Sequence, residues 1–307
     1  MFDSERNKNV VIAGGTGFIG SALTRVLLLM GYRPIILTRG KSSKNGVPFI
    51  SYSDPQSVAA ISASFAVINL AGQNIASSFW TKAFRKKIMQ SRIETAQWLT
   101  NTIRDCANKP DVFIQASATG FYGNGGDALL TESSAQGEGF LAGVCREWEK
   151  PATELPANEI RSVVARFGIV LSSEAGFLKN NLLSFRYFLG GYFGNGKQWI
   201  PWIHINDLVR AILFLMEQKD ARGFYNLVSP RAVTARRFAK EMAKITNKPV
   251  CLRFPAKIST FIFGQLAREV LLSGQKVFPE KLLNEGFKFH FNEINNALQN
   301  LIVVKPT

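Results

Sequence analysis

The feature that most constrains the fold lies near the start of the chain. An apolar run, Asn9 to Ala13, is followed by Gly14, Gly17 and Gly20 and then by the amphipathic segment Phe18 to Met30. In a strand–turn–helix unit of this kind the first glycine permits a tight turn, the second lets backbone approach a pyrophosphate, and the third lets the helix pack closely. The helix N-terminus favours the phosphate charge. An ordinary glycine-rich turn is the alternative, but placement between strand and helix favours a dinucleotide loop. We expect these loop residues to bind the cofactor: Gly14, Thr16, Gly17, Phe18, Ile19 and Gly20.

Short apolar runs alternate with longer amphipathic ones over most of the chain. Further strands are predicted at Pro34–Thr38, Phe49–Tyr52, Ala66–Leu70, Asp111–Ser117, Ser162–Val170 and Phe224–Val228. Further helices are predicted at about Trp80–Cys106, at Phe140–Leu155, and from an N-cap at Asn206 or Asp207 to about Glu217. Such alternation is typical of repeated βαβ units. The sequence therefore predicts an α/β protein with a doubly wound parallel sheet (Rossmann fold) and a smaller, mostly helical C-terminal cap.

The predicted domains are a nucleotide-binding domain at 1–229 and a cap or substrate domain at 230–307, with 172–205 looping out toward the cap. The stretch GGYFGNGKQWIPWIHIND cannot be one regular element and is interpreted as a functional loop. Four aromatic residues could close over a flat or sugar-like substrate or fill the seam between the lobes, and both alternatives stay open: Phe121, Phe193, Trp199 and Trp202. The absence of repeats and low-complexity linkers leads us to expect lobes that pack together.

Composition excludes several classes of protein. With 307 residues, of which 46% are hydrophobic, the chain can bury a large core. Its cysteines, Cys106, Cys145 and Cys251, are odd in number and widely spaced, which argues against disulfides and zinc. With only two histidines, we expect no metal site. Since no apolar run approaches the ~20 residues that span a bilayer, we expect a cytoplasmic protein without a membrane partner.

The net charge of +15 could report a polyanionic partner or a solvated basic surface. The basic residues cluster in two segments that are predicted to be helical: Lys82, Arg85, Lys86, Lys87 and Arg92, then Arg231, Arg236, Arg237, Lys240, Lys244 and Lys248. Neither segment lies in a recognisable nucleic-acid module. We therefore expect a small-molecule substrate and no nucleic acid, and both a monomer and a homodimer remain open.

The end of the second predicted strand indicates which nicotinamide cofactor is used. An acidic residue there would bind a free ribose, whereas a basic one would pair with a 2′-phosphate. This strand ends at Thr38 and Arg39, Lys41 follows, and no acid is near. Arg39 could be merely a solvated charge, but arginine forms bidentate pairs with phosphate. The predicted cofactor is NADP.

Several motifs together resemble the short-chain dehydrogenase/reductase superfamily in its extended, epimerase-like branch. They are GGTGFIG, NLAG (Asn69 to Gly72), SATGFYG (Ser117 to Gly123) and WIHINDL. Further stretches, SRIETAQWL, ARFGIVLS and VFPEKLLNEGFKF, are similar to atypical NAD-dependent epimerase/dehydratase-like proteins that carry a C-terminal domain of unknown function. The resemblance implies a Rossmann fold, an NADP cofactor and an undefined substrate. It also implies that Leu70, Ala71 and Gly72 line the adenosine and that Arg92, with Lys87 a weaker candidate, contacts a cofactor phosphate.

The usual acid/base pair of that superfamily, a tyrosine followed four residues later by a lysine, is absent. None of the six tyrosines has a lysine at that spacing. On the segment that should carry the pair, Phe140 or Leu141 replaces the tyrosine, and Val144 or Cys145 replaces the lysine. The catalytic candidates that remain are Ser117, Thr119 and Tyr122.

Each of these candidates has a structural alternative. The two hydroxyls could hold a substrate carbonyl or satisfy backbone at a strand end, and Tyr122 could protonate the carbonyl or pack under the loop. Glu132 is a further polar residue of this region. Cys145 is interpreted as a packing residue rather than a nucleophile, and His204 as a hydrogen-bonded structural residue rather than a general base.

The leading functional hypothesis is an NADP(H)-binding oxidoreductase or epimerase-like protein that transfers a hydride to or from a small substrate. The runner-up is a sensor or scaffold module that binds NADP(H) without chemistry. A third, weaker hypothesis makes the basic surface primary and the nucleotide structural.

Overall fold

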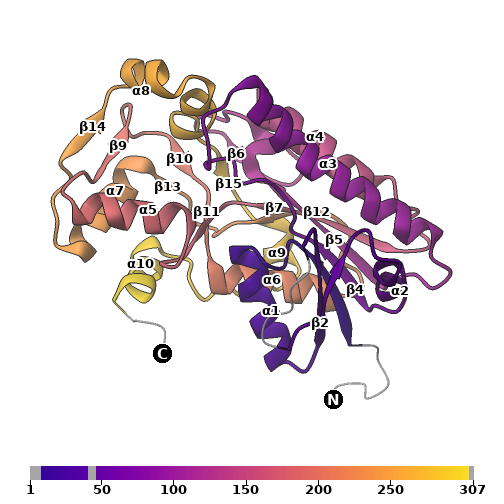
Figure 1. The fold of residues 1–307 in the computed structure, drawn as a ribbon. Helices are drawn as coiled ribbons and strands as arrows, with labels where there is room; N and C mark the ends of the chain where they lie inside the picture. Colours follow the sequence, from indigo (N-terminus) through magenta and orange to yellow (C-terminus); the bar gives the residue numbers. More distant parts are fainter. Residues whose placement is uncertain (1–7, 41–45, 304–307) are drawn as a thin grey trace.

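The protein is described by a computed structural model that covers residues 8–40 and 46–303. Seven parallel strands form its main sheet, in the order β12-β7-β5-β4-β1-β2-β3 (Figure 1). The strands are β1 (Asn9–Ala13), β2 (Arg33–Thr38), β3 (Phe49–Ser51), β4 (Ala66–Asn69), β5 (Val112–Ala118), β7 (Arg161–Phe167) and β12 (Gly223–Leu227). The strand order reverses between β1 and β4, so the carboxyl ends of these two strands open the crevice in which such sheets bind nucleotides.

Helices cover both faces of the sheet (Figure 1). On one face lie α1 (Phe18–Leu29) and α6 (Ile205–Glu217), and on the other lie α2 (Gln56–Ser62), α3 (Lys82–Asp105) and α4 (Phe140–Thr153). Alternate residues of β1 show why two layers form, since Val10 and Ile12 pack into the first core and Val11 and Ala13 into the second. The doubly wound α/β prediction is confirmed.

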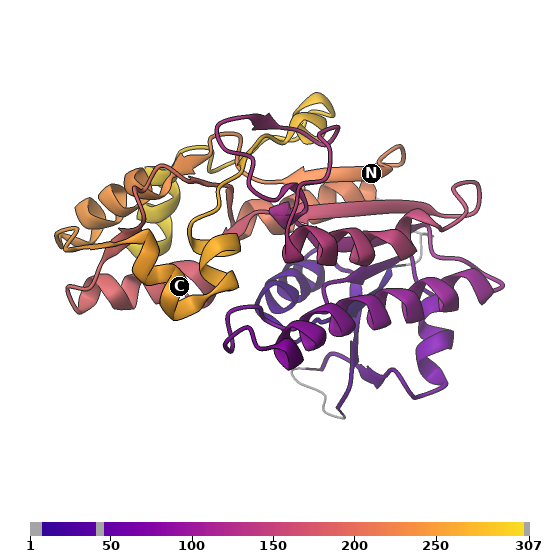
Figure 2. The same ribbon diagram turned by 90° about the horizontal axis from the view of Figure 1, so that it is seen from above.

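A second lobe lies beside the sheet, as Figure 2 shows from above. Its core is formed mainly by α5 (Gly176–Arg186), α7 (Ala235–Thr246) and α10 (Ile294–Ile302). Three of the short strand pairs flank it: β9 (Gly191–Phe193) with β14 (Leu252–Phe254), β10 (Trp199–Ile200) with β13 (Val233–Thr234), and β8 (Ile169–Leu171) with β11 (Trp202–His204). The C-terminal region is mostly helical, as predicted. Residues 176–200 pack with residues 233–302, while the domain boundary at 229 stays a prediction.

The remaining elements complete the fold, and several of them join the two lobes. They are the helical turn η1 (Thr119–Tyr122), β6 (Leu129–Leu130) paired with β15 (Lys276–Val277), α8 (Ala256–Phe263), the π-helical turn η2 (Ala267–Leu271) and α9 (Glu280–Asn284). Although α9 is late in the sequence, its Leu282 packs into the core that α1 and α6 share with the sheet. The chain therefore crosses between the lobes several times.

Two local predictions were wrong. The strand predicted at Ser162–Val170 divides at Gly168, where a Cβ would lie 2.8 Å from the Pro201 carbonyl oxygen, and β8 then pairs with β11. The N-cap of α6 is His204, rather than Asn206 or Asp207, because its imidazole accepts a hydrogen bond from the Asn206 N–H at 3.0 Å.

Candidate functional site

The glycine-rich loop between β1 and α1 is shaped by contacts that exclude larger residues. Gly14 has φ +78°, and a Cβ there would lie 2.8 Å from the backbone of Leu70 and Ala71. A Cβ at Gly20 would lie 2.5 Å from the Gly14 carbonyl oxygen. Gly17 is the N-cap of α1 and supplies no side-chain acceptor to its first turn. The loop thus has the open cradle of backbone N–H groups that a pyrophosphate requires.

The end of β4 is the second wall of this crevice. The buried Asn69 accepts a hydrogen bond from the Ala71 N–H at 3.1 Å and donates one to Gln115 on β5 at 2.9 Å. These bonds fix the turn that carries Leu70, Ala71 and Gly72, the predicted adenosine-lining residues. The backbone of Leu70 and Ala71 also packs against Gly14. The structure therefore brings together the glycine loop and the predicted adenosine-lining segment.

The predicted 2′-phosphate residues lie at the end of β2, beside β1. The Thr38 hydroxyl accepts a hydrogen bond from the Gly40 N–H at 3.2 Å, which holds the turn in which Arg39 is exposed. Arg39 lies near Tyr52, and although burial raises the pKa of that phenol to about 12, the guanidinium charge opposes this rise. Lys41 lies outside the described residues. Arg39 is therefore free of the core and close to the carboxyl edge of the sheet.

Arg92, on α3, lies against the β4 turn. Its Nη1 donates to the carbonyl oxygens of Gln73 and Ile88, both at 3.0 Å, and its guanidinium stacks over Trp148 with Cζ 4.9 Å from the ring centroid. A Cβ at Gly72 would lie 3.3 Å from Nη2, so the other end of the guanidinium faces that glycine. Lys87, the weaker candidate, is exposed more than one turn earlier on the same helix.

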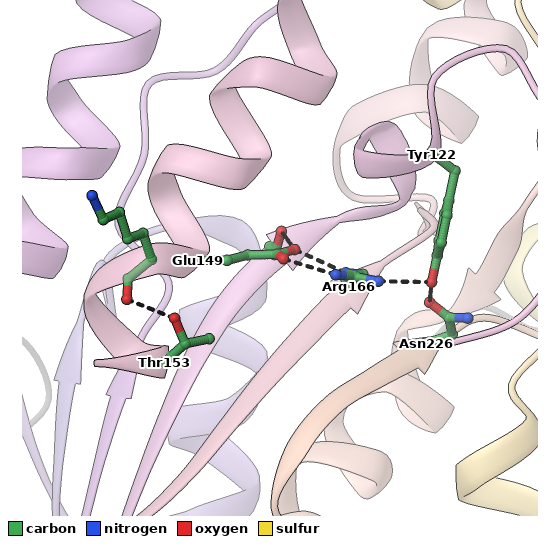
Figure 3. A network of polar contacts seen from close by, with 7 residues as sticks. Tyr122, Glu149, Thr153, Arg166 and Asn226 are labelled. Carbon is green, nitrogen blue, oxygen red and sulfur yellow. Dashed lines mark hydrogen bonds and ion pairs between the residues drawn. The ribbon is translucent and has the colours of Figure 1, made fainter. Parts of the chain in front are cut away.

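A buried network runs from the end of β5 to the end of β12 (Figure 3). Its centre is Arg166 on β7, which donates from Nε and Nη2 to the two carboxylate oxygens of Glu149 on α4, at 2.9 and 2.8 Å. The Ser117 hydroxyl donates to the same carboxylate at 2.6 Å. Burial alone would lower the pKa of Arg166, but the paired Glu149 raises it above its ordinary value. This bond holds the Ser117 hydroxyl beside the ion pair of Arg166 and Glu149.

Tyr122 continues this network. Its hydroxyl donates to Asn226 Oδ1 at 2.7 Å and accepts from Arg166 Nη1 at 3.0 Å. Burial raises the pKa of Tyr122, partly offset by the charge of Arg166, so the phenol stays protonated near neutral pH. Glu132 accepts the Asn226 N–H at 3.0 Å, and burial raises the pKa of its carboxyl as well. The structure therefore brings Ser117, Tyr122 and Glu132 into one chain of contacts.

Thr119 differs from the other two catalytic candidates. It begins η1 directly after β5 and is 5% exposed, and its hydroxyl makes no hydrogen bond within the described part of the chain. Cys145, one turn into α4, is buried, and burial raises the pKa of its thiol to about 12, with the Glu149 charge adding to this rise. A thiol in that state is a poor nucleophile. Among the three catalytic candidates, Thr119 is the one whose hydroxyl proton has no acceptor within the described residues, whereas Ser117 donates to Glu149 and Tyr122 to Asn226.

The N-terminus of α4, where the superfamily tyrosine would stand, is capped from the second lobe. Both oxygens of Glu269 on η2 accept backbone N–H groups, from Phe140 at 3.0 Å and Leu141 at 2.8 Å. Gln265 donates to Glu269 at 2.6 Å and accepts from Arg85 on α3. This contact stabilises the positive end of the helix and ties η2 to α3 and α4.

The aromatic residues of the predicted loop have separate partners. Trp202 is fully buried in the second-lobe core and donates to the Arg231 carbonyl at 2.9 Å, which favours the packing alternative for this ring. Trp199 donates to Asp127 at 2.7 Å. Phe193 stacks on Phe254 with the two ring centroids 5.0 Å apart. Phe121 lies under the Arg166 guanidinium, 3.5 Å from Cζ.

Four side chains of this site were not predicted from the sequence: Glu149, Arg166, Asn226 and Glu269. A charge within the apolar run SVVARFGIV was the available signal for Arg166, because an arginine in a buried strand needs a partner. The other contacts join segments far apart in sequence, so no local pattern indicated them.

Neither a metal centre nor a membrane span is found among the residues that the structure describes. No three His, Cys, Asp or Glu side chains of that part of the chain are grouped so as to hold a metal ion. No helix within it is long and apolar enough to cross a membrane.

Comparison with known proteins identifies relatives over nearly the whole chain. The model of the NAD dependent epimerase/dehydratase family matches residues 10–140 and 186–227, and a domain of unknown function, DUF1731, matches residues 254–301. An epimerase family protein of Staphylococcus saprophyticus is 35% identical over 298 residues, which cover 96% of this chain and 99% of that protein. The resemblance inferred from the motifs is confirmed.

Solved structures agree with this relationship. The crystal structure of the human epimerase family protein SDR39U1 with NADPH has a TM-score of 0.87 at 32% identity, covering 95% of this chain and 98% of that chain. A nucleoside-diphosphate sugar epimerase from Corynebacterium glutamicum has a TM-score of 0.76 at 30% identity, covering 98% of this chain and 59% of that one. The fold, the glycine loop and the full-length relatives lead to one conclusion: the chain belongs to the NAD dependent epimerase/dehydratase family.

Proposed function

We propose that this protein binds NADPH in the crevice between β1 and β4 and transfers a hydride between it and a small carbonyl or sugar-like substrate. The observation that carries the proposal is the loop at Gly14, Gly17 and Gly20, whose close contacts leave an open helix N-terminus at the switch point of the sheet. The human relative determined with NADPH supports the choice of cofactor. When bound, NADPH supplies the hydride.

The residues that hold the cofactor are assigned by their positions. The loop residues Gly14, Thr16, Gly17, Phe18, Ile19 and Gly20 bind the pyrophosphate, and Leu70, Ala71 and Gly72 line the adenosine. Thr38 positions the turn from which Arg39 pairs with the 2′-phosphate. Arg92 contacts a phosphate from the side of Gly72, through the guanidinium end that is not bonded to Gln73.

The first prediction tests the 2′-phosphate assignment. Arg39→Ala should remove a preference for NADPH over NADH of at least about tenfold, the ~1.4 kcal/mol that one guanidinium–phosphate pair can supply. Titration calorimetry with both cofactors measures the change. Arg33→Ala is the matched control, because Arg33 is an exposed arginine at the opposite end of β2 and should not affect either affinity. Equal affinities of the unaltered protein for the two cofactors would contradict the assignment.

The proton is assigned to Tyr122, with Ser117 and Thr119 holding the substrate oxygen. Carbonyl reduction needs the acid form of the donor, and burial raises the pKa of Tyr122, so this form persists through the neutral range. Thr119 contributes the hydroxyl that the described part of the protein does not itself use. The direction of reaction proposed from these groups is reduction with NADPH.

The second prediction concerns turnover. With aldehydes, ketones or nucleotide sugars, NADPH oxidation should be constant across neutral pH and should fall only above the usual tyrosine range, where the phenol ionises. Tyr122→Phe should lower turnover, while Tyr187→Phe, at a tyrosine that is 67% exposed at the end of α5, should not. Unchanged turnover in Tyr122→Phe would remove Tyr122 from the chemistry.

A non-catalytic NADPH-binding sensor or scaffold is the second candidate function. It is favoured by the bonds of Ser117 to Glu149 and of Tyr122 to Asn226, which occupy both hydroxyl protons inside the protein. Apolar residues and a buried thiol also stand where α4 would carry the tyrosine and lysine. Tight NADPH binding without turnover of any of these substrates would favour this function.

A further inference from the structure

Helix α8 presents its apolar face to solvent. Ile258, Phe261 and Ile262, at helical spacing i, i+3 and i+4, are 53%, 92% and 54% exposed. Ser259, by contrast, is buried and its hydroxyl donates to the Pro255 carbonyl at 3.0 Å. A surface helix ordinarily turns its apolar stripe toward the core, so this helix has the opposite orientation. Neighbouring large apolar residues left exposed in this way mark an interaction site.

The exposed face is held in place by the second lobe. Phe254, at the end of β14, is 37% exposed and stacks on Phe193 of β9 at 5.0 Å, so the residues that lead into α8 are anchored. On the other side, η2 is fixed by the bonds of Glu269 to the first turn of α4. Figure 1 shows α8 at the top of this lobe. The exposed apolar face of α8 is therefore held between two anchored segments of the fold.

The charged residues that flank α8 in the sequence are basic. No aspartate or glutamate occurs between Glu241 and Glu269, while that stretch contains Lys244, Lys248, Arg253, Lys257 and Arg268. Glu269 itself faces the N–H groups of α4. An apolar face with basic flanks has the chemistry of helices that lie in the interface of an anionic membrane, where apolar side chains enter the headgroup region and Lys and Arg meet lipid phosphates.

A second copy of the chain fits this face less well. A two-fold symmetric contact would bring the same residues of both copies together, and with them both sets of basic side chains. Such juxtaposed like charges oppose association. An anionic membrane is complementary to both kinds of group, because its headgroup/acyl boundary accepts apolar side chains and its anionic headgroups attract basic ones.

We propose that α8, with Phe254 and the flanking Arg253, Lys257 and Arg268, is a docking surface for anionic lipid membranes. Docking of α8 would bring the neighbouring η2 and the first turn of α4 close to the lipid surface. The proposal does not depend on the proposed chemistry, because it concerns a different surface. It departs from the expectation of no membrane partner that composition suggested.

The test is sedimentation of the whole protein with vesicles of phosphatidylcholine alone and of phosphatidylcholine mixed with phosphatidylglycerol. We expect binding to the mixed vesicles that weakens with added salt, and little binding to the neutral ones. Phe261→Ser and Lys257→Glu should each lower the partition coefficient by about tenfold. NADPH affinity, measured in parallel, should be the same in both variants.

Two matched controls lie on α1, away from α8. Leu29→Ser alters an apolar residue that is 82% exposed, and Arg25→Glu reverses an exposed charge, and neither should change vesicle binding. Failure to bind mixed vesicles, or binding unaffected by Phe261→Ser, would overturn the proposal. So would a dimer in sedimentation velocity without lipid that dissociates in Phe261→Ser, because a second copy would then cover α8.

Discussion

Arg166 shows how a buried charge can be tolerated at a site. Its side chain is 2% exposed and that of Glu149 is 4% exposed, so both ions lose their hydration on folding. This desolvation cost is offset because the two ions make further hydrogen bonds beyond their own pair: Glu149 accepts one from Ser117, and Arg166 donates one to Tyr122. Phe121 and Phe224 also lie over the guanidinium, 3.5 and 4.5 Å from Cζ. Such a network defines one arrangement of the carboxyl ends of β5 and β7.

The third prediction follows from this pairing. Arg166→Met should destabilise the protein by about 3–5 kcal/mol, because Glu149 is left as a buried charge without a partner. Adding Glu149→Met should recover part of this loss, since the pair is then replaced by apolar groups of similar volume. The free energies of unfolding in urea measure both effects. A double variant less stable than Arg166→Met would contradict this account of the network.

At the scale of elements, the start of α6 depends on a neutral imidazole. His204 Nδ1 accepts the Asn206 N–H at 3.0 Å, which places the proton on Nε2, and this nitrogen donates to Asn300 Oδ1 at 3.2 Å. Phe291 stacks on the imidazole ring of His204, with the two ring centroids 3.8 Å apart. Protonation of Nδ1 would remove the cap. Burial accordingly lowers the pKa of His204 from 6.5 to about 4.

The fourth prediction is the pH dependence that this cap creates. The unfolded chain binds a proton at His204 below pH 6.5, whereas the folded chain does so only below about 4. The contribution of His204 is therefore complete above pH 6.5 and is lost as the pH falls toward 4, by roughly 3 kcal/mol.

The control for this prediction is His204→Asn, which keeps a capping side chain but cannot titrate. Urea unfolding between about pH 7 and pH 4 should give a smaller loss of stability for the variant than for the unaltered protein. Parallel losses for the two proteins would show that other groups cause the acid sensitivity.

The elements were predicted from the sequence to different extents, for physical reasons. The strands of the main sheet were predicted because each one is an apolar run of consecutive residues. The glycine loop was predicted because the three glycines of its motif lie within seven consecutive residues. The short strands β9 and β10 were missed, since two or three residues carry no periodicity. The network around Arg166 joins residues 117, 122, 149 and 226, and no local pattern encodes such distant partners.

At the scale of the whole molecule, contacts between the lobes decide whether they move independently. Asp207, fully buried on α6, accepts the N–H groups of His290 at 3.0 Å and Phe291 at 2.8 Å, just before α10 begins. His204 bonds to Asn300 on α10 itself, and Glu269 joins η2 to α4. These bonds are buried or half-buried and lie at several places along the border. We therefore expect the lobes to unfold as one cooperative unit.

The last prediction tests this coupling with NADPH as the probe. At about 100 times its dissociation constant a ligand that binds the folded state adds about 2.7 kcal/mol of stability. Because NADPH is proposed to bind the loop before α1, independent lobes would show this gain in the hydrogen exchange of α1 but not in that of α7, whereas coupled lobes would show it in both. Asp207→Ala removes the acceptor of two N–H groups and should reduce the gain at α7 while that at α1 persists. If α7 in the unaltered protein gains no protection from NADPH although α1 does, the lobes are independent and the cap moves on its own.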